Sequence, residues 1–192
     1  MNKIIFSNII EKYKNQYILK WCTNLNKKLS LKSIETLETI NLLGTYMYIQ
    51  GDYNNAIDLF CLTDSLKFNG NWNIWNEVYD SQILKARVFN KLGKADIAEQ
   101  TKKDLNLKTT GGILNWKSNI NSACTIPMDE RINVAIKEGL SKHNGEFVFR
   151  MKLFKLIWLL KFIEGSVFID DFYNKKILEA EALIKEIKEI GN

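Results

Sequence analysis

Apolar residues recur every three or four positions along most of the chain, which is the spacing of an α-helix that buries one face. The first such stripe lies in residues 4–28 and comprises Phe6, Ile10, Tyr13, Tyr17 and Trp21. A second begins at Ser30 or Ser33, either of which can cap a helix, and continues to Gly51. We therefore predict two long helices in the N-terminal quarter of the chain.

The remaining stripes predict six further helices, so that about eight are expected in all. Glycine, proline or clusters of Asn and Ser separate them. Their predicted ranges are 54–66, 77–92, 95–105, 127–141, 147–165 and 172–190. The most apolar stretch, 147–168, is interrupted by charged residues, so we interpret it as a central buried helix and not as a membrane span. The predicted fold class is all-α.

Length and composition favour a single all-α domain over residues 1–192. The chain is long enough to bury a core, 46% of its residues are hydrophobic, and it contains one proline. We predict an N-terminal half, 1–105, and a C-terminal half, 127–192, joined by a crossover loop, 106–126, rich in Gly, Thr, Ser and Asn. Loops of this length are uncommon in compact domains and are often functional, so a role for the loop stays open.

Two of the predicted helix pairs form hairpins with a glycine at the turn, Gly51 in the first and Gly93 in the second. A small residue lies seven positions before each glycine, and another lies five positions after it. These small residues are Gly44 and Ala56 in the first hairpin and Ala86 and Ala98 in the second. Small residues at matched heights allow two antiparallel helix backbones to approach closely, which explains why glycine occurs inside a helical stripe.

This spacing resembles the tetratricopeptide repeat (TPR), in which small residues, glycine and aromatic residues recur at these offsets. The matching residues are Leu43, Gly44, Gly51, Tyr53, Ala56 and Phe60, then Ala86, Phe89, Gly93 and Ala98. The resemblance covers residues 37–105, and its two copies are offset by 42 residues, where the usual repeat is about 34. It implies antiparallel hairpins in a TPR-like, right-handed superhelical or solenoid arrangement that binds another protein.

In the repeat family the first helix of each hairpin lines a groove for the partner. The residues at the corresponding positions are Glu38, Asn41, Thr45, Tyr48, Asp80, Arg87, Asn90 and Lys91. Their mixture of charged and hydrogen-bonding groups suits an extended peptide or a loop. Trp72, Trp75 and Trp116 lie in predicted loops and are candidate partner anchors, with packing of these loops onto the core as the alternative.

The net charge of +5 is concentrated near the N-terminus, where residues 1–32 carry seven lysines and one acid, Glu11. Such a region can bind an acidic partner, a nucleic acid or an anionic membrane surface. The alternative is the solvated face of an amphipathic helix. The aromatic residues of the same segment fall on one helical face, which favours this second interpretation.

No catalytic or metal-binding set is recognisable, so we predict a protein that is not an enzyme and needs no cofactor or metal. The one histidine, His143, lies in a turn without an identifiable nucleophile or orienting acid beside it. The three cysteines Cys22, Cys61 and Cys124 form no CxxC pair and are expected to be buried free thiols in a reducing cytoplasm.

The sequence therefore predicts a cytoplasmic protein–protein interaction module. An adaptor or a bacterial immunity or antitoxin-like protein would suit a small, helical, non-catalytic chain. The alternative is a nucleic-acid-binding protein that uses the lysine-rich residues 1–32. Membrane insertion is not expected, and the oligomeric state stays open.

Overall fold

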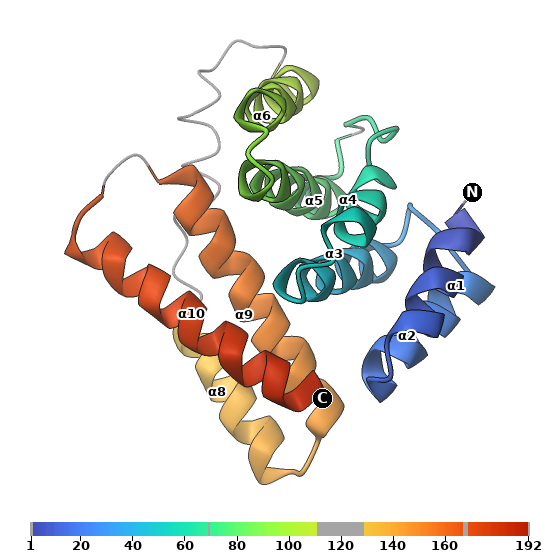
Figure 1. The fold of residues 1–192 in the computed structure, drawn as a ribbon, viewed down its shortest axis with the longest axis vertical. Helices are drawn as coiled ribbons and strands as arrows, with labels where there is room; N and C mark the ends of the chain where they lie inside the picture. The colour runs from blue at the N-terminus through green and yellow to red at the C-terminus, as the bar shows by residue number, and fades with distance from the viewer. Residues whose placement is uncertain (1, 69, 111–128, 167–168, 192) are drawn as a thin grey trace. The chain divides into compact units, whose positions relative to one another are not determined.

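The computed structural model describes residues 2–68, 70–110, 129–166 and 169–191 (Figure 1). All regular secondary structure in these ranges is helical and forms nine helices, which confirms the prediction of an all-α fold. The chain divides into two compact units, residues 1–114 and residues 115–191, with Asn192 grouped with the first. The boundary falls inside the segment predicted as the crossover loop.

The described part of unit 1 consists of three consecutive helical hairpins. Their helices are α1 (Asn2–Lys12), α2 (Gln16–Lys27), α3 (Ile34–Ile49), α4 (Tyr53–Cys61), α5 (Trp72–Lys91) and α6 (Ala95–Thr110). Each even-numbered helix packs on the helix before it, and α5 packs on both α3 and α4. Figure 1 shows α3 to α6 nearly end-on, as neighbouring coils.

The prediction of one helix over 4–28 is wrong, because the chain turns at residues 13–15 and forms two helices. The Asn15 side chain accepts hydrogen bonds from the backbone N–H groups of Tyr17 and Ile18 at 2.9 and 3.1 Å, which starts a new helix. The apolar stripe hid this turn because its period continues across it. Both helices bury apolar side chains, among them Phe6 of α1 and Trp21 of α2.

Of the two predicted starts of the next helix, Ser30 and Ser33, the structure has Ser33, whose side chain accepts from the N–H of Thr36. Eleven residues further, Gly44 gives the first hairpin its close packing. A Cβ atom at this position would overlap with the ring of Phe60 on α4. A small residue at this height is therefore required for the aromatic ring of α4 to reach the backbone of α3.

Both predicted glycine turns are present and have the same hydrogen bonds. Gly51 and Gly93 have positive φ angles of 78° and 74°, which glycine adopts without steric cost. In each turn the next residue donates its N–H to the carbonyl five positions earlier, Asp52 to Met47 and Lys94 to Phe89, both at 2.9 Å. This is the Schellman motif that ends many helices.

Three helix boundaries in unit 1 differ from the prediction. Helix α5 begins at Trp72 instead of residue 77 because the Asn71 side chain caps it by accepting from the N–H groups of Asn73 and Ile74. Helix α4 ends at Cys61 instead of residue 66, and α6 continues to Thr110 instead of ending at residue 105. The first part of the predicted crossover loop is therefore helical.

The described part of unit 2 contains α8 (Asp129–Ser141), α9 (Gly145–Gly165) and α10 (Asp171–Gly191). Helix α9 packs on both α8 and α10, as expected for the most apolar stretch. Lys155 of α9 is nevertheless buried; its ammonium donates to Asn133 Oδ1 at 2.9 Å and pairs with Glu179. No helix in the described ranges has the length and apolar character that crossing a membrane requires.

Candidate functional site

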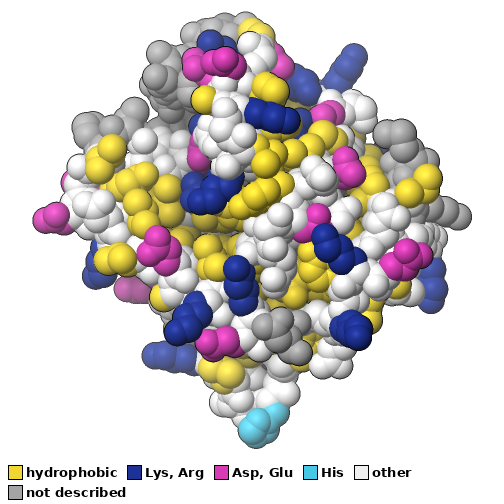
Figure 2. All heavy atoms as spheres, viewed as in Figure 1, with side chains coloured by type: hydrophobic (Ala, Val, Ile, Leu, Met, Phe, Trp, Pro, Cys, Tyr) yellow, Lys and Arg dark blue, Asp and Glu magenta, His cyan; other side chains and the backbone are white. Residues whose placement is uncertain are grey.

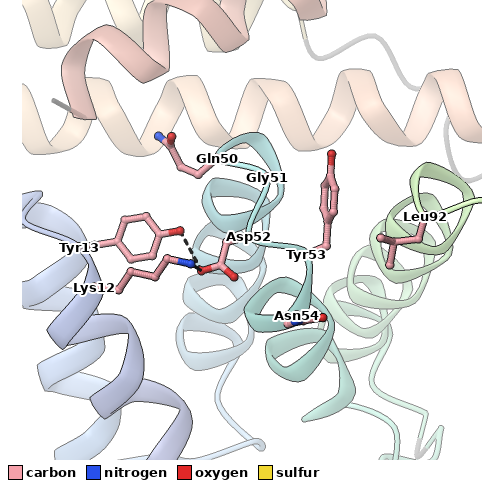
Figure 3. A pocket seen from close by; sticks show the side chains of 8 residues that line it. All are labelled: Lys12, Tyr13, Gln50, Gly51, Asp52, Tyr53, Asn54 and Leu92. Carbon is pink, nitrogen blue, oxygen red and sulfur yellow. Dashed lines mark hydrogen bonds and ion pairs between the residues drawn. The ribbon is translucent and has the colours of Figure 1, made fainter.

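A surface cleft of about 460 Å³ lies where the hairpins of unit 1 turn (Figure 3). Its lining comes from all three hairpins: Lys12 and Tyr13 at the end of α1, residues 50–54 at the α3–α4 turn, and Leu92 at the α5–α6 turn. In Figure 3 the Tyr53 ring lies between Asp52 and Leu92. The cleft thus offers a carboxylate, an ammonium group, two phenols, two amides and an apolar side chain.

Asp52 is the acid of this lining, and its carboxylate is already paired. Its Oδ2 atom accepts from Lys12 Nζ at 2.8 Å, Tyr13 OH at 2.9 Å and Asn55 Nδ2 at 2.7 Å. Burial alone would raise the pKa of Asp52, but these hydrogen bonds and the charge of Lys12 outweigh it and hold the pKa below its ordinary value. The carboxylate is therefore charged and engaged at neutral pH.

The same contacts fix the protonation of Tyr13. Burial, followed by its hydrogen bond to Asp52, raises the pKa of the Tyr13 phenol far above its ordinary value. Tyr13 also packs edge-on against Tyr46, with ring centroids 5.7 Å apart. The phenol is thus protonated at neutral pH and donates its hydrogen bond to Asp52.

Beside the cleft, Tyr48 of α3 and Arg87 of α5 join the two helices that were predicted to line a groove. Arg87 Nε donates to Tyr48 OH at 3.1 Å, and the guanidinium lies 5.9 Å from the centre of the ring. Tyr48 also contacts Tyr53, with ring centroids 6.0 Å apart. Both Tyr48 and Arg87 are half-buried, so part of each side chain faces solvent.

The predicted groove needs a correction at three of its eight positions. Asn41, Thr45 and Asp80 are buried, with at most 8% of each residue exposed. Asn41 instead joins α3 to α5, because its amide donates to the carbonyl and carboxylate oxygens of Glu77 at 2.9 and 3.0 Å and its Oδ1 accepts from Ser81. These three side chains are therefore packing groups in this structure.

The other five predicted positions are accessible, although they do not form one cluster. Glu38 is half-buried near the start of α3, ten residues before Tyr48. Asn90 and Lys91 are exposed at the end of α5, close in sequence to Arg87. The accessible part of the predicted groove therefore gathers at the C-terminal ends of α3 and α5, next to the cleft.

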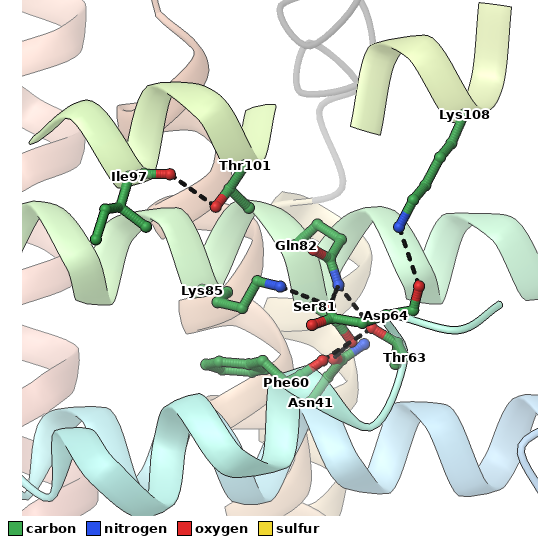
Figure 4. A network of polar contacts seen from close by, with 10 residues as sticks. All are labelled: Asn41, Phe60, Thr63, Asp64, Ser81, Gln82, Lys85, Ile97, Thr101 and Lys108. Carbon is green, nitrogen blue, oxygen red and sulfur yellow. Dashed lines mark hydrogen bonds and ion pairs between the residues drawn. The ribbon is translucent and has the colours of Figure 1, made fainter. Parts of the chain in front are cut away.

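A second polar cluster joins the residues after α4 to α5 and α6 (Figure 4). Asp64 pairs with Lys85 and accepts from Gln82 Nε2 at 2.8 Å, while its backbone carbonyl accepts from Lys108 Nζ at 3.0 Å. Gln82 also donates to Thr63 Oγ1 at 2.9 Å. Every one of these contacts ties a connecting segment to a helix, so we assign the cluster to the fold.

The tryptophan candidates separate into two kinds. Trp75 is 1% exposed and Trp72 is 56% exposed, and both rings contact Phe68, with centroid distances of 5.6 and 4.6 Å. Both belong to the first turn of α5 and not to a loop. Trp75 is therefore a core residue, whereas Trp72 presents its ring to solvent. Trp116 lies outside the described residues.

The remaining candidates for chemistry show no reactive arrangement in the described ranges. Burial raises the pKa of Cys22 to about 12 and that of Cys61 to about 11, so both thiols are protonated. Cys61 is exposed as a residue, against our expectation, and Cys124 lies outside the described residues. Within those ranges no three acidic, histidine or cysteine side chains gather as metal ligands.

The sequence did not predict the cleft. Lys12 and Asp52 are 40 positions apart, and nothing in the local pattern of either residue indicates that they meet. One local signal did exist. Asp52 follows Gly51 directly and stands at the start of a helix, where an aspartate is expected to cap the helix with its side chain. Asp52 makes no such cap, because its carboxylate is engaged with α1.

Comparison with known proteins places the chain in a family. The profile of the family of unknown function DUF6707 matches residues 3–171, which is most of the chain, and the protein belongs to this family. No curated protein and no solved structure matches it.

Proposed function

We propose that this member of the DUF6707 family is a non-enzymatic protein–protein interaction module, either an adaptor or an immunity protein. The TPR-like hairpins of unit 1 would contact the partner. The observation that carries the proposal is the accessible pair of Tyr48 and Arg87, which bridges the first helices of two successive hairpins beside a cleft. Tyrosine and arginine are enriched among the residues that dominate binding energy at protein interfaces.

The surroundings of this pair support the same function. Tyr53 extends the aromatic surface beyond Tyr48, and Lys91 and Asn90 add exposed polar groups one helical turn from Arg87. An aromatic centre with a polar rim is the usual composition of a protein interface. A solenoid-like arrangement of the three hairpins would place this surface along one side of the array.

A pull-down from native lysate with the full chain as bait tests this proposal. The critical variant is Arg87→Glu combined with Lys91→Glu, which reverses two charges at the proposed surface. The matched control is Lys137→Glu with Lys185→Glu, which changes the net charge equally at exposed positions of α8 and α10. We expect a stoichiometric partner that survives nuclease treatment, is lost with the first variant and is retained with the control.

Two outcomes would contradict the proposal. Capture that is equal for both variants would place the interaction elsewhere, and an empty lane with the wild-type chain would remove it. The immunity form has its own test, because it requires that expression of the chain protects cells from one particular toxin. Protection by wild type but not by the Arg87→Glu, Lys91→Glu variant would favour that form over a general adaptor.

Nucleic-acid binding by residues 1–32 is the second candidate. The structure distributes their lysines over α1, the turn after it, α2 and the following loop, and one of them, Lys12, is paired with Asp52. Figure 2 shows both basic and acidic side chains on the face that it draws. Unchanged mobility of DNA and RNA in low-salt gel shifts would exclude this candidate, whereas a steep loss of binding with salt would support it.

A further inference from the structure

The rim of the cleft, by which we mean the residues within two sequence positions of its lining, is basic. Within two positions of its lining residues lie four lysines, Lys12, Lys14, Lys91 and Lys94, against two acids, Glu11 and Asp52. Lys12 and Asp52 neutralise each other at 2.8 Å. Lys14, Lys91 and Lys94 are exposed and take part in no ion pair with the described residues. Two different hairpins therefore contribute exposed lysines to the rim, and these lysines form no ion pair within the described part of the chain.

The lining of the cleft adds groups that suit a polypeptide. The side-chain amides of Gln50 and Asn54 can each donate and accept a hydrogen bond, as a peptide backbone requires. Leu92 is 38% exposed and lies at the cleft with the ring of Tyr53, so both can contact an apolar side chain. The volume of about 460 Å³ falls within the range of specific ligand sites.

We propose that this cleft binds a short acidic segment of the partner protein that carries one apolar side chain. Carboxylates of the segment would lie against Lys14, Lys91 and Lys94, its backbone would bond the amides of Gln50 and Asn54, and its apolar side chain would contact Leu92. This inference rests on the proposed function, which it deepens by naming the chemistry of the partner.

The charges of the lining argue for a peptide over a nucleic acid. Lys12 and Asp52 neutralise each other in the lining, and Glu11 lies next to Lys12 in the sequence. A phosphodiester strand carries a negative charge at every nucleotide, so it would place phosphates where the lining offers no net positive charge. A peptide can place its carboxylates opposite the lysines and neutral residues opposite the Lys12–Asp52 pair, so it matches these charges better than a phosphodiester strand does.

The test uses the purified full chain and fluorescein-labelled probes in an anisotropy titration. The probes are the peptide Glu-Glu-Leu-Glu-Glu, the same peptide with glycine for leucine, the peptide Lys-Lys-Leu-Lys-Lys, and a thymidine decamer. Asn54→Trp fills the cleft without changing its charge, and Lys14→Glu with Lys94→Glu reverses the rim. Lys137→Glu with Lys185→Glu is again the matched control, and circular dichroism verifies that every variant folds.

We expect the leucine-containing acidic peptide to bind more tightly than the other three probes. Its affinity should fall about tenfold or more, which corresponds to about 1.4 kcal/mol, with Asn54→Trp and with the rim reversal, and it should be unchanged in the control. Equal or tighter binding of the thymidine decamer would overturn the proposal, as would an affinity that Asn54→Trp leaves intact.

Competition in the pull-down separates the two proposals. Displacement of the captured partner by the acidic peptide supports both. A partner that depends on Arg87 and Lys91 but is not displaced by the peptide leaves the proposed function standing and overturns the acidic-segment inference. Peptide binding by the purified chain without any captured partner overturns the proposed function and supports the assignment of the cleft.

Discussion

The α3–α4 hairpin of unit 1 and the α8–α9 hairpin of unit 2 make the same turn with different residues. In unit 2 the αL position is held by His143, with φ 52°, where unit 1 has Gly51. Asn144 donates its N–H to the carbonyl of Gly139 at 2.9 Å, which repeats the bond from Asp52 to Met47. The turn is therefore set by backbone hydrogen bonds, and glycine only lowers the conformational strain at the position with positive φ.

The two hairpins differ in where their helices approach most closely. In α3–α4 the small residue, Gly44, lies seven positions before the turn and faces the Phe60 ring. In α8–α9 the small residue, Gly139, lies four positions before the turn, and a Cβ there would be 2.8 Å from both Phe147 and Val148. A search of the sequence for a small residue seven positions before the turn therefore overlooks the α8–α9 hairpin.

The residue after the turn differs as well, and this difference bears on function. Asn144 caps α9 by accepting from the N–H of Phe147 at 3.1 Å. Asp52 occupies the corresponding place before α4, makes no cap and binds Lys12 and Tyr13 of another hairpin instead. In unit 1 the Asp52 side chain thus makes a contact between hairpins in place of a helix cap, and this contact helps to form the cleft.

The largest expected effect is from Gly44→Val. The new side chain collides with the buried Phe60 ring, and overpacking of a core at such a site costs about 3 kcal/mol. The midpoint of urea unfolding measures this cost. The same change in a Phe60→Leu background should cost much less, and an equal cost in both backgrounds would disprove the close approach as its cause.

Gly139→Val provides the comparison in unit 2 and should cost less than Gly44→Val. One of the two contacts is with Phe147, which is 37% exposed and can move toward solvent. We expect a loss of about 1–2 kcal/mol in urea unfolding. A loss as large as that of Gly44→Val would show that the two hairpins are equally tight at their small residues.

Asp52→Asn should weaken the contact between α1 and the α3–α4 turn by about 1 kcal/mol at neutral pH, because the group that accepts from Lys12 and Tyr13 loses its negative charge. The folded-state pKa of Asp52 is below its ordinary value. Its contribution to stability is therefore present above about pH 4 and is lost as pH falls through the folded-state pKa. Wild type and variant should converge in urea midpoint at low pH; a constant difference would contradict this.

Asn144→Ala tests the residue of unit 2 that corresponds to Asp52. It removes a helix cap, which costs about 1 kcal/mol, and this cost should not depend on acid pH because an amide does not titrate. Urea unfolding at neutral and acid pH measures both properties. A pH-dependent loss would mean that Asn144 acts through a charged neighbour and not as a cap.

The smallest expected effect is a gain from His143→Gly. Histidine in the αL region is strained, and glycine relieves this strain at some entropic cost, so we expect stabilisation of about 0.5 kcal/mol. The matched control is Gly93→Ala, which places a side chain at a residue with positive φ instead of removing one. It should destabilise the protein by a similar or larger amount. Thermal unfolding measures both changes: the melting temperature should rise with His143→Gly and fall with Gly93→Ala.

Local signals predicted the elements well. The all-α class, the cap at Ser33, the turns at Gly51 and Gly93 and the packing role of Gly44 all follow from helical periodicity, capping and backbone conformation. These properties depend on residues within a few positions of each other. Prediction failed where two local signals competed, as at Asn15, where a continuous apolar stripe concealed a turn.

The functional candidates were harder to predict because exposure is not a local property. Asn41 and Glu38 are both polar residues of α3. Asn41 is buried and hydrogen-bonded to α5, whereas Glu38 is half-buried and keeps part of its side chain in solvent. Trp72 and Trp75 likewise differ in exposure although they are three positions apart. Which polar or aromatic residue faces solvent depends on the neighbouring helix.

The sequence by itself therefore determined the all-helical class, most of the helices, two of the turns and the close approach within the first hairpin, since each rests on short-range backbone and side-chain preferences. The tertiary structure alone decided that Lys12, Asp52 and Leu92 meet at one cleft. These residues belong to three different hairpins, and only the packing of the hairpins against one another brings them to the same cleft. The chemistry that we assign to this protein arises from that packing.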